Sequence, residues 1–166
     1  GKTRYYQSNG QGKTGEYCEN GKWYYFDKNG IMQKGFVQLP EKTVYYNENG
    51  VMQYGEQKIG NYYYYFDTVF GSMYSGWKTV NGKTRYYQSN GQSKIGEYCE
   101  NGRWYYFDKN GKPLTGVQYL DGHYYYFGDG GCMEYGNYDE NGKYQYWKSY
   151  GEKKRYYTFS SDKQYA

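Results

Sequence analysis

The side chains that could act as acids, bases or nucleophiles are few in this chain, and they follow a repeat. Asp27, Asp67 and Asp108 recur at matched positions, and paired carboxylates are the catalytic groups of most glycoside hydrolases. Each of the three begins a predicted turn, where an aspartate side chain caps the backbone. The same position holds Asn47 and Gln88 in sister segments. We therefore expect these carboxylates to be structural and the chain not to be an enzyme.

One histidine and three cysteines are the remaining candidates for catalysis or metal binding. His123 stands where matched segments carry Lys or Arg at the start of a predicted strand, which indicates a surface position. Cys18 and Cys99 share one repeat position and are expected to lie too far apart for a disulfide, and Cys132 has no matched partner. None of the spacings resembles a zinc site. We expect no metal and no cofactor.

An internal repeat positions these residues. Residues 1–30 recur at 82–111 with three changes, Gly12 to Ser93, Thr14 to Ile95 and Lys22 to Arg103. Glycines also recur every 20 or 21 residues, at positions 15, 35, 55, 76, 96, 116 and 136. This spacing predicts an array over 1–136 with units 15–34, 35–54, 55–75, 76–95, 96–115 and 116–135, then a terminal hairpin and cap over 137–166. The array starts partway through a repeat, so we expect a piece of a longer protein.

Aromatic residues replace the usual aliphatic core. The 166 residues include 30 Tyr and 25 Gly but two Pro, and the mean hydropathy is −1.26. Aromatic residues make up 25% of the chain, and each ring can bury about 150–250 Å². The formal charge of +4 is spread without a basic cluster, so no nucleic-acid partner is expected. No apolar run approaches the roughly 20 residues that span a bilayer, so no membrane insertion is expected.

Asn-Gly and Asp-Gly pairs predict the shape of each unit. Pairs such as Asn20-Gly21 and Asp121-Gly122 favour the tight turns of β-hairpins. The flanking segments are short and aromatic, which suits strands, and no segment keeps a 3.6-residue period. We predict an all-β fold: a solenoid of about 20-residue β-hairpin repeats with little or no helix.

The units resemble the cell-wall-binding repeats of Gram-positive surface proteins and phage lysins, which include the choline-binding modules. The resemblance rests on a glycine, an aromatic run ending in Asp, a second glycine, and a Met before the closing glycine, as in residues 15–35. The glucan-binding repeats of glucansucrases and the C-terminal repeats of large clostridial toxins are similar. The resemblance covers about residues 1–136 and implies a β-hairpin solenoid, secretion, cell-surface or cell-wall association and non-catalytic binding.

In choline-binding relatives, an aromatic box between consecutive units holds the quaternary ammonium through cation–π contacts. Carried over by position, the resemblance implies a box at two junctions: Trp23, Met32, Phe36 and Tyr46, and Tyr63, Met73, Trp77 and Tyr87. Other junctions depart from the pattern. The position after the glycine holds Glu16, Glu56, Glu97 and Val117, the position before Tyr-Tyr holds Val44 and Arg85, and Leu114 replaces the Met beside Trp104.

Glucan-binding and toxin relatives instead stack a sugar on an exposed ring beside polar groups. Trp23 and Trp104, with Gln33, Lys34 and Gln118 close in sequence, fit that description. We therefore expect a secreted surface module that binds a cell-wall or extracellular glycan (a glucan or teichoic acid) through aromatic sites between repeats. Choline on teichoic acid is the first alternative. A structural spacer, or a toxin-type repeat that binds a receptor glycan, is the second.

Overall fold

A computed structural model describes residues 2–120, 123–138 and 144–148 of the chain as a succession of β-hairpins. No helix occurs in these residues, which confirms the predicted all-β fold of repeated hairpins. The chain divides into two units. The first comprises Gly1–Gly76 and Tyr87–Gln92, and the second comprises Trp77–Tyr86 and Ser93–Ala166.

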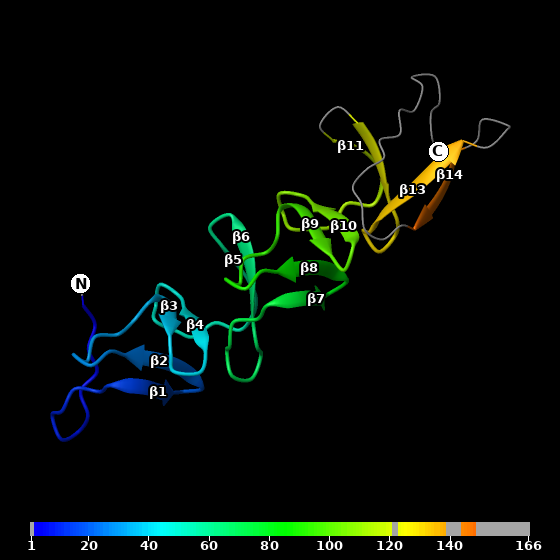
Figure 1. Cartoon of the computed structure of the whole chain (residues 1–166). Coiled ribbons are helices and arrows are strands. Elements are labelled where there is room, and N and C mark those ends of the chain that lie inside the picture. Colours follow the sequence, from blue (N-terminus) through cyan, green and yellow to red (C-terminus); the bar gives the residue numbers. More distant parts are fainter. Residues whose placement is uncertain (1, 121–122, 139–143, 149–166) are drawn as a thin grey trace. The chain divides into compact units, whose positions relative to one another are not determined.

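Three successive hairpins build the first unit (Figure 1). They are β1 (Gly15–Glu19) with β2 (Lys22–Phe26), β3 (Gly35–Gln38) with β4 (Thr43–Tyr46), and β5 (Gly55–Ile59) with β6 (Tyr62–Phe66). In each, the glycine that opens the first strand pairs with the last residue of the second, as in Gly15 with Phe26 and Gly35 with Tyr46. The glycine spacing read from the sequence therefore marks the start of each hairpin.

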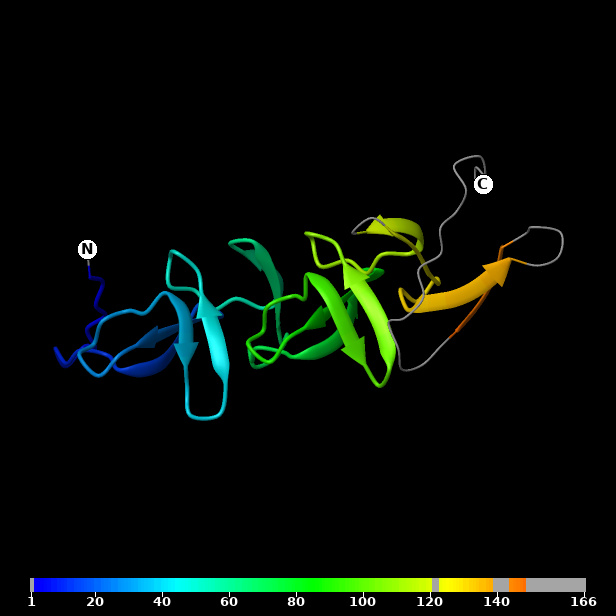
Figure 2. The same cartoon turned by 45° about the horizontal axis from the view of Figure 1, so that its top comes forward.

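The second unit contains hairpins and a larger sheet (Figure 2). Most of β7 (Gly76–Val80) and β8 (Lys83–Tyr87) belongs to it, followed by β9 (Gly96–Glu100) with β10 (Arg103–Phe107). The strands β11 (Gly116–Leu120), β12 (His123–Phe127), β13 (Met133–Tyr138) and β14 (Tyr144–Lys148) then form one four-stranded sheet. β13 begins before the boundary predicted at residue 137. The rest of the predicted cap, residues 149–166, lies outside the described residues.

The turns explain why these short segments pair. Asn20 in the first unit has φ 50° and is followed by Gly21 at φ 73°, the conformation that a two-residue hairpin turn requires. At the second turn, Asp27 Oδ1 accepts hydrogen bonds from the amides of Asn29 (2.8 Å) and Ile31 (3.0 Å). Asn47, Asp67 and Asp108 cap their own turns in the same way. The predicted structural role of the repeated aspartates is confirmed.

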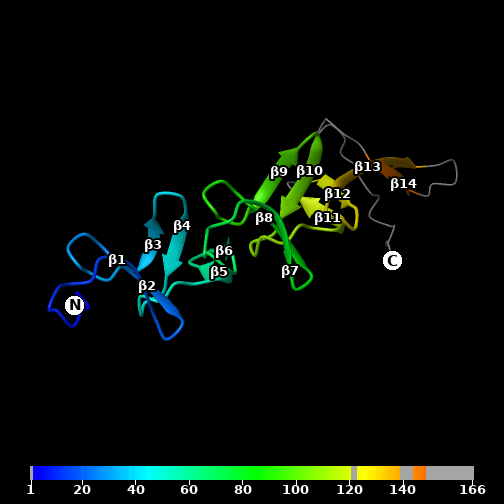
Figure 3. The same ribbon diagram turned by 90° about the horizontal axis from the view of Figure 1, so that it is seen from below.

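Rings at the strand ends are buried in the core of the first unit. Phe26, Tyr46, Phe66 and Tyr87 each end the second strand of a hairpin, and all are buried. A single hairpin is marginally stable in water, so each ring must be covered by its neighbours. Figure 3 shows the β3–β4 hairpin beside β1 and β2 within this unit.

Methionines in the links join consecutive hairpins of the first unit. The amides of Met32, Met52 and Met73 donate to the carbonyls of Thr3, Trp23 and Thr43 in the preceding segment, at 2.8–2.9 Å. Their sulfur atoms fill the space beside a later turn glycine. A Cβ on Gly71 would come within 2.7 Å of Met52 Sδ, for example. These methionines therefore support the packing of the array.

Candidate functional site

The residue after each opening glycine alternates between an acid and an apolar side chain. In chain order these residues are Glu16, Phe36, Glu56, Trp77, Glu97 and Val117. The residue that ends the second strand of each hairpin alternates between Phe and Tyr as far as Phe107, and the order along the chain is Phe26, Tyr46, Phe66, Tyr87, Phe107 and Phe127. The structural period is therefore two hairpins. We call the positions of Glu16, Glu56 and Glu97 acid junctions, and those of Phe36 and Trp77 aromatic junctions.

Strand register corrects one assignment made from the sequence. Counting back from the pairs Gly15 with Phe26 and Gly35 with Tyr46 places Thr43, not Val44, at the position of Trp23. A shift of one residue moves a strand side chain to the opposite face of the hairpin. Val44 accordingly lies in the core with Tyr46. Arg85, at the matching place in β8, is buried as well.

The first aromatic junction places Phe36 against the next hairpins. Its ring lies 5.0 Å from Tyr45, 4.9 Å from Tyr64 and 6.3 Å from Phe66, measured between centroids. Phe36 still exposes 44% of its surface. It is therefore both a packing residue and an accessible ring.

The second aromatic junction embeds Trp77 in the second unit. Its ring lies 4.8 Å from Tyr105, 5.3 Å from Tyr86 and 5.6 Å from Phe107. Its indole Nε1 donates to Glu100 Oε2 at 2.8 Å. These contacts give Trp77 a structural function and hold its ring in one orientation.

Two acid junctions of the first unit satisfy their carboxylates differently. Glu56 Oε1 accepts a hydrogen bond from the buried Tyr87 hydroxyl at 2.9 Å. The matching tyrosine for Glu16 is Tyr46, but Glu16 forms an ion pair with Lys42 at 3.2 Å instead. The Tyr46 hydroxyl is buried and has no hydrogen-bond partner among the described residues. Burial, with the nearby Glu16 charge as a smaller cause, raises the pKa of Tyr46 and keeps it neutral.

This contrast predicts opposite effects of one substitution at two matched positions. Tyr46→Phe is expected to raise the free energy of unfolding by about 1 kcal/mol, because it removes a buried hydroxyl that lacks a partner. Tyr87→Phe is expected to lower it by about 1–3 kcal/mol, because it removes a hydrogen bond to a carboxylate. Urea unfolding followed by circular dichroism measures both. Equal loss of stability in the two variants would contradict the assignment.

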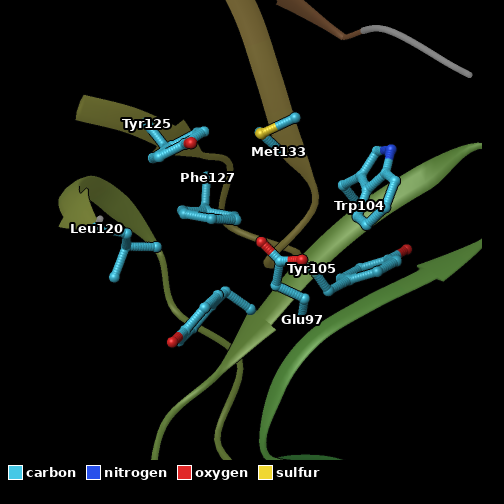
Figure 4. Close-up of a pocket in the computed structure, with 8 residues that line it drawn as sticks. Glu97, Trp104, Tyr105, Leu120, Tyr125, Phe127 and Met133 are labelled. Atoms are coloured by element: carbon cyan, nitrogen blue, oxygen red, sulfur yellow. The ribbon is translucent and has the colours of Figure 1, made fainter. Parts of the chain in front are cut away.

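The third acid junction, in the second unit, forms a small pocket open to solvent. Glu97, Trp104, Tyr105, Tyr106, Leu120, Tyr125, Phe127 and Met133 line it. Figure 4 shows the Glu97 carboxylate directed toward the space bounded by Phe127, Met133 and Trp104. Phe127 stands where the other acid junctions have Tyr46 and Tyr87, so no tyrosine hydroxyl is supplied from that position. A carboxylate beside several ring faces is an arrangement that favours a cation.

The structure distributes the predicted site residues between accessible and buried places. Trp23 is 41% exposed, and Tyr63 is half-buried with Lys58 Nζ 5.6 Å from its ring centroid. Tyr46 and Tyr87 are buried in the core. Met32 and Met73 pack against the turn glycines Gly50 and Gly91. Tyr63, Met73 and Tyr87 belong to the first unit and Trp77 to the second, so a box made of all four stays a prediction.

Several pocket residues were missed by reasoning from the sequence. Glu97 was read as a departure from the aromatic pattern, yet it lines the pocket with Trp104. Met133 was not considered, although it lies in the last predicted unit, 116–135, at the link position of Met32. Met52, which holds the same link position and is a core residue rather than a pocket residue, was missed as well. Counting 20 residues from one link to the next would have found both. Pro113, rather than Leu114, holds the link position after β10, where it bridges to Phe107.

Neither a metal centre nor a membrane span is found in the described part of the chain. No group of three or more His, Cys, Asp or Glu side chains is placed there to hold a metal ion. Cys18, Cys99 and Cys132, all within these residues, form no disulfide. Within the same residues, no helix has the length and apolar character needed to cross a membrane.

Comparison with known families identifies the repeats. Residues 74–112 match the model of a choline-binding repeat, and residues 17–32 match that of a putative cell wall binding repeat. No match to a curated protein sequence was found.

Solved structures from Streptococcus pneumoniae share the fold. CbpJ of strain TIGR4 is 31% identical with a TM-score of 0.66, and the match covers 83% of this chain and 49% of CbpJ. Choline binding protein F is 27% identical with a TM-score of 0.65, over 82% of this chain and 49% of that one. Its structure in the presence of a peptidoglycan analogue matches at 27% identity and a TM-score of 0.65, over 84% and 48%. This chain thus spans about half the length of these proteins.

Proposed function

We propose that the chain is a secreted, non-catalytic module that attaches a larger protein to choline-bearing polymers of the cell wall. The matches to a choline-binding repeat and to a putative cell wall binding repeat support this proposal. The observation that carries the choline assignment is the pocket of the third acid junction. Its carboxylate and aromatic walls suit a compact quaternary ammonium group, which cannot donate hydrogen bonds and binds through charge and cation–π contacts.

Three features of the pocket support this assignment. The Glu97 carboxylate supplies the opposite charge, and Trp104 offers the ring type that binds cations best. Met133 and Tyr125 are buried and form a fixed wall.

A neutral glycan is the second candidate, favoured by the exposed rings of the first unit. Trp23 and Phe36 present 41% and 44% of their surfaces to solvent. Such rings can stack on the apolar face of a sugar. The polymer would then be bound through its sugar backbone rather than through choline.

Retention on immobilised ligands separates these candidates. We expect the chain to be retained on a choline-substituted resin and released by millimolar choline, whether or not it is also retained on insoluble glucan. Repetition of weak sites raises avidity when one polymer can reach several of them. Retention on glucan without retention on choline would favour the second candidate. Retention on neither, with an intact circular dichroism spectrum, would leave a structural spacer.

A further inference from the structure

The first acid junction is bordered by a groove that differs from the pocket at Glu97. The groove has a volume of about 600 Å³ and is far larger than that pocket. Glu16, Tyr25 and Leu39 line it, at the repeat positions that Glu97, Tyr106 and Leu120 hold in the later copy. The two sites therefore share one scaffold, and the residues that close each site are different.

An ion pair borders the groove at Glu16, whereas aromatic walls border the pocket at Glu97. Lys42 Nζ lies 3.2 Å from Glu16 Oε1 and 3.0 Å from the carbonyl oxygen of Phe70. The ammonium offsets the Glu16 charge, which weakens the attraction of the groove for a cation. Glu41 also borders the groove, but it is exposed, and water and salt screen its charge. The pair presents hydrogen-bond donors and acceptors side by side.

A one-residue insertion places an aromatic ring at the groove. The unit at 55–75 is one residue longer than its neighbours, and the extra residue enlarges the turn after β6. The Gly71 amide bonds to Asp67 across this turn, four residues back, whereas Gly30 bonds to Asp27, three residues back. Val69 and Phe70 are left 69% and 68% exposed. Of these two side chains, Phe70 lines the groove and Val69 does not.

We propose that this groove is a second binding site, which takes a neutral sugar ring. Phe70 and Tyr25 supply ring faces for the C–H face of the sugar. Glu16 accepts hydrogen bonds from its hydroxyls, while Lys42 and Ser72 donate. The assignment does not depend on choline recognition, because it concerns another junction with other chemistry. The duplicated scaffold then recognises two different chemical groups, a cation in the later copy and a sugar in the earlier one.

Titration of the whole chain with two soluble disaccharides, followed by NMR chemical shifts, tests the proposal. Isomaltose represents an α-glucan, and N,N′-diacetylchitobiose represents an amino-sugar polymer. We expect one of the two to bind, Phe70→Ala to weaken it about tenfold, and Lys42→Gln to weaken it several-fold. Val69→Ala, at the adjacent and equally exposed position, is the matched control and should not change the affinity.

Three outcomes would overturn the proposal. They are binding of neither disaccharide, equal affinity in wild type and Phe70→Ala, and displacement of the bound sugar by choline. Failure of choline recognition has a separate signature. The unmodified chain would then not be retained on choline resin, whatever the result with sugars. Circular dichroism of each variant verifies folding, which Phe70→Ala should preserve because the side chain is exposed.

Discussion

Phe66→Ala is expected to lower the free energy of unfolding by about 3–5 kcal/mol, the usual cost of truncating a fully buried phenylalanine. Phe66 has no exposed surface, and its ring lies 6.0 Å from Tyr45, 6.3 Å from Phe36 and 6.4 Å from Tyr64. Its removal leaves a cavity where the β3–β4 and β5–β6 hairpins meet. A repeat array is stabilised mainly by contacts between neighbours, so this loss should spread beyond one hairpin. Urea unfolding followed by circular dichroism measures it.

Phe70→Ala is the matched control, since it removes the same side chain four residues later from a position that is 68% exposed. Its effect on stability should stay within about 0.5 kcal/mol. If Phe66→Ala lowered the free energy of unfolding by less than about 1 kcal/mol, the rings at the strand ends would not form the core of this unit. Phe66→Leu keeps most of the volume and should lie between wild type and the alanine variant.

Trp104→Leu and Glu97→Gln are each expected to weaken choline binding by roughly 3- to 30-fold. Leucine preserves apolar packing against Tyr125, Phe127 and Met133 while removing the indole face. Glutamine preserves the shape of Glu97 while removing its charge. Because Glu97 is exposed, its contribution should shrink as salt concentration rises. Calorimetric titration with choline at low and high salt measures both effects.

Comparison with the earlier copy tests the pocket assignment. Trp23 matches Trp104 in the repeat but does not line the pocket of Figure 4. Trp23→Leu is therefore expected to lower the choline affinity less than Trp104→Leu does. Val69→Ala, an exposed site outside the pocket, should have no effect. Equal losses in the Trp23 and Trp104 variants would mean that choline binds at both copies. An unchanged affinity in Glu97→Gln would remove the carboxylate from the site.

Local sequence was sufficient for the hairpins and their turns. Asn20-Gly21 and the turn at Asp27 have conformations set by residues within a few positions, so their chemistry is readable directly from the sequence. It was harder to predict from the sequence which face of a hairpin each side chain occupies. Val44 appeared to match Trp23 until the pairing of Gly35 with Tyr46 fixed the register. Two adjacent tyrosines look alike in sequence, and a slip of one residue reverses every face.

The sequence by itself determined a 20-residue hairpin repeat, its resemblance to cell-wall-binding repeats and the duplication of residues 1–30 at 82–111. Trp23 and Trp104 have almost identical neighbours in the sequence. Only the tertiary structure decided that Trp23 is an exposed ring and that Trp104 lines a pocket. The residues that cover each tryptophan come from the next hairpin, where Tyr125 stands at the position of Val44. Burial depends on these distant neighbours, whereas turns and strands depend on adjacent ones. A duplication of local sequence therefore repeated the scaffold without repeating the site.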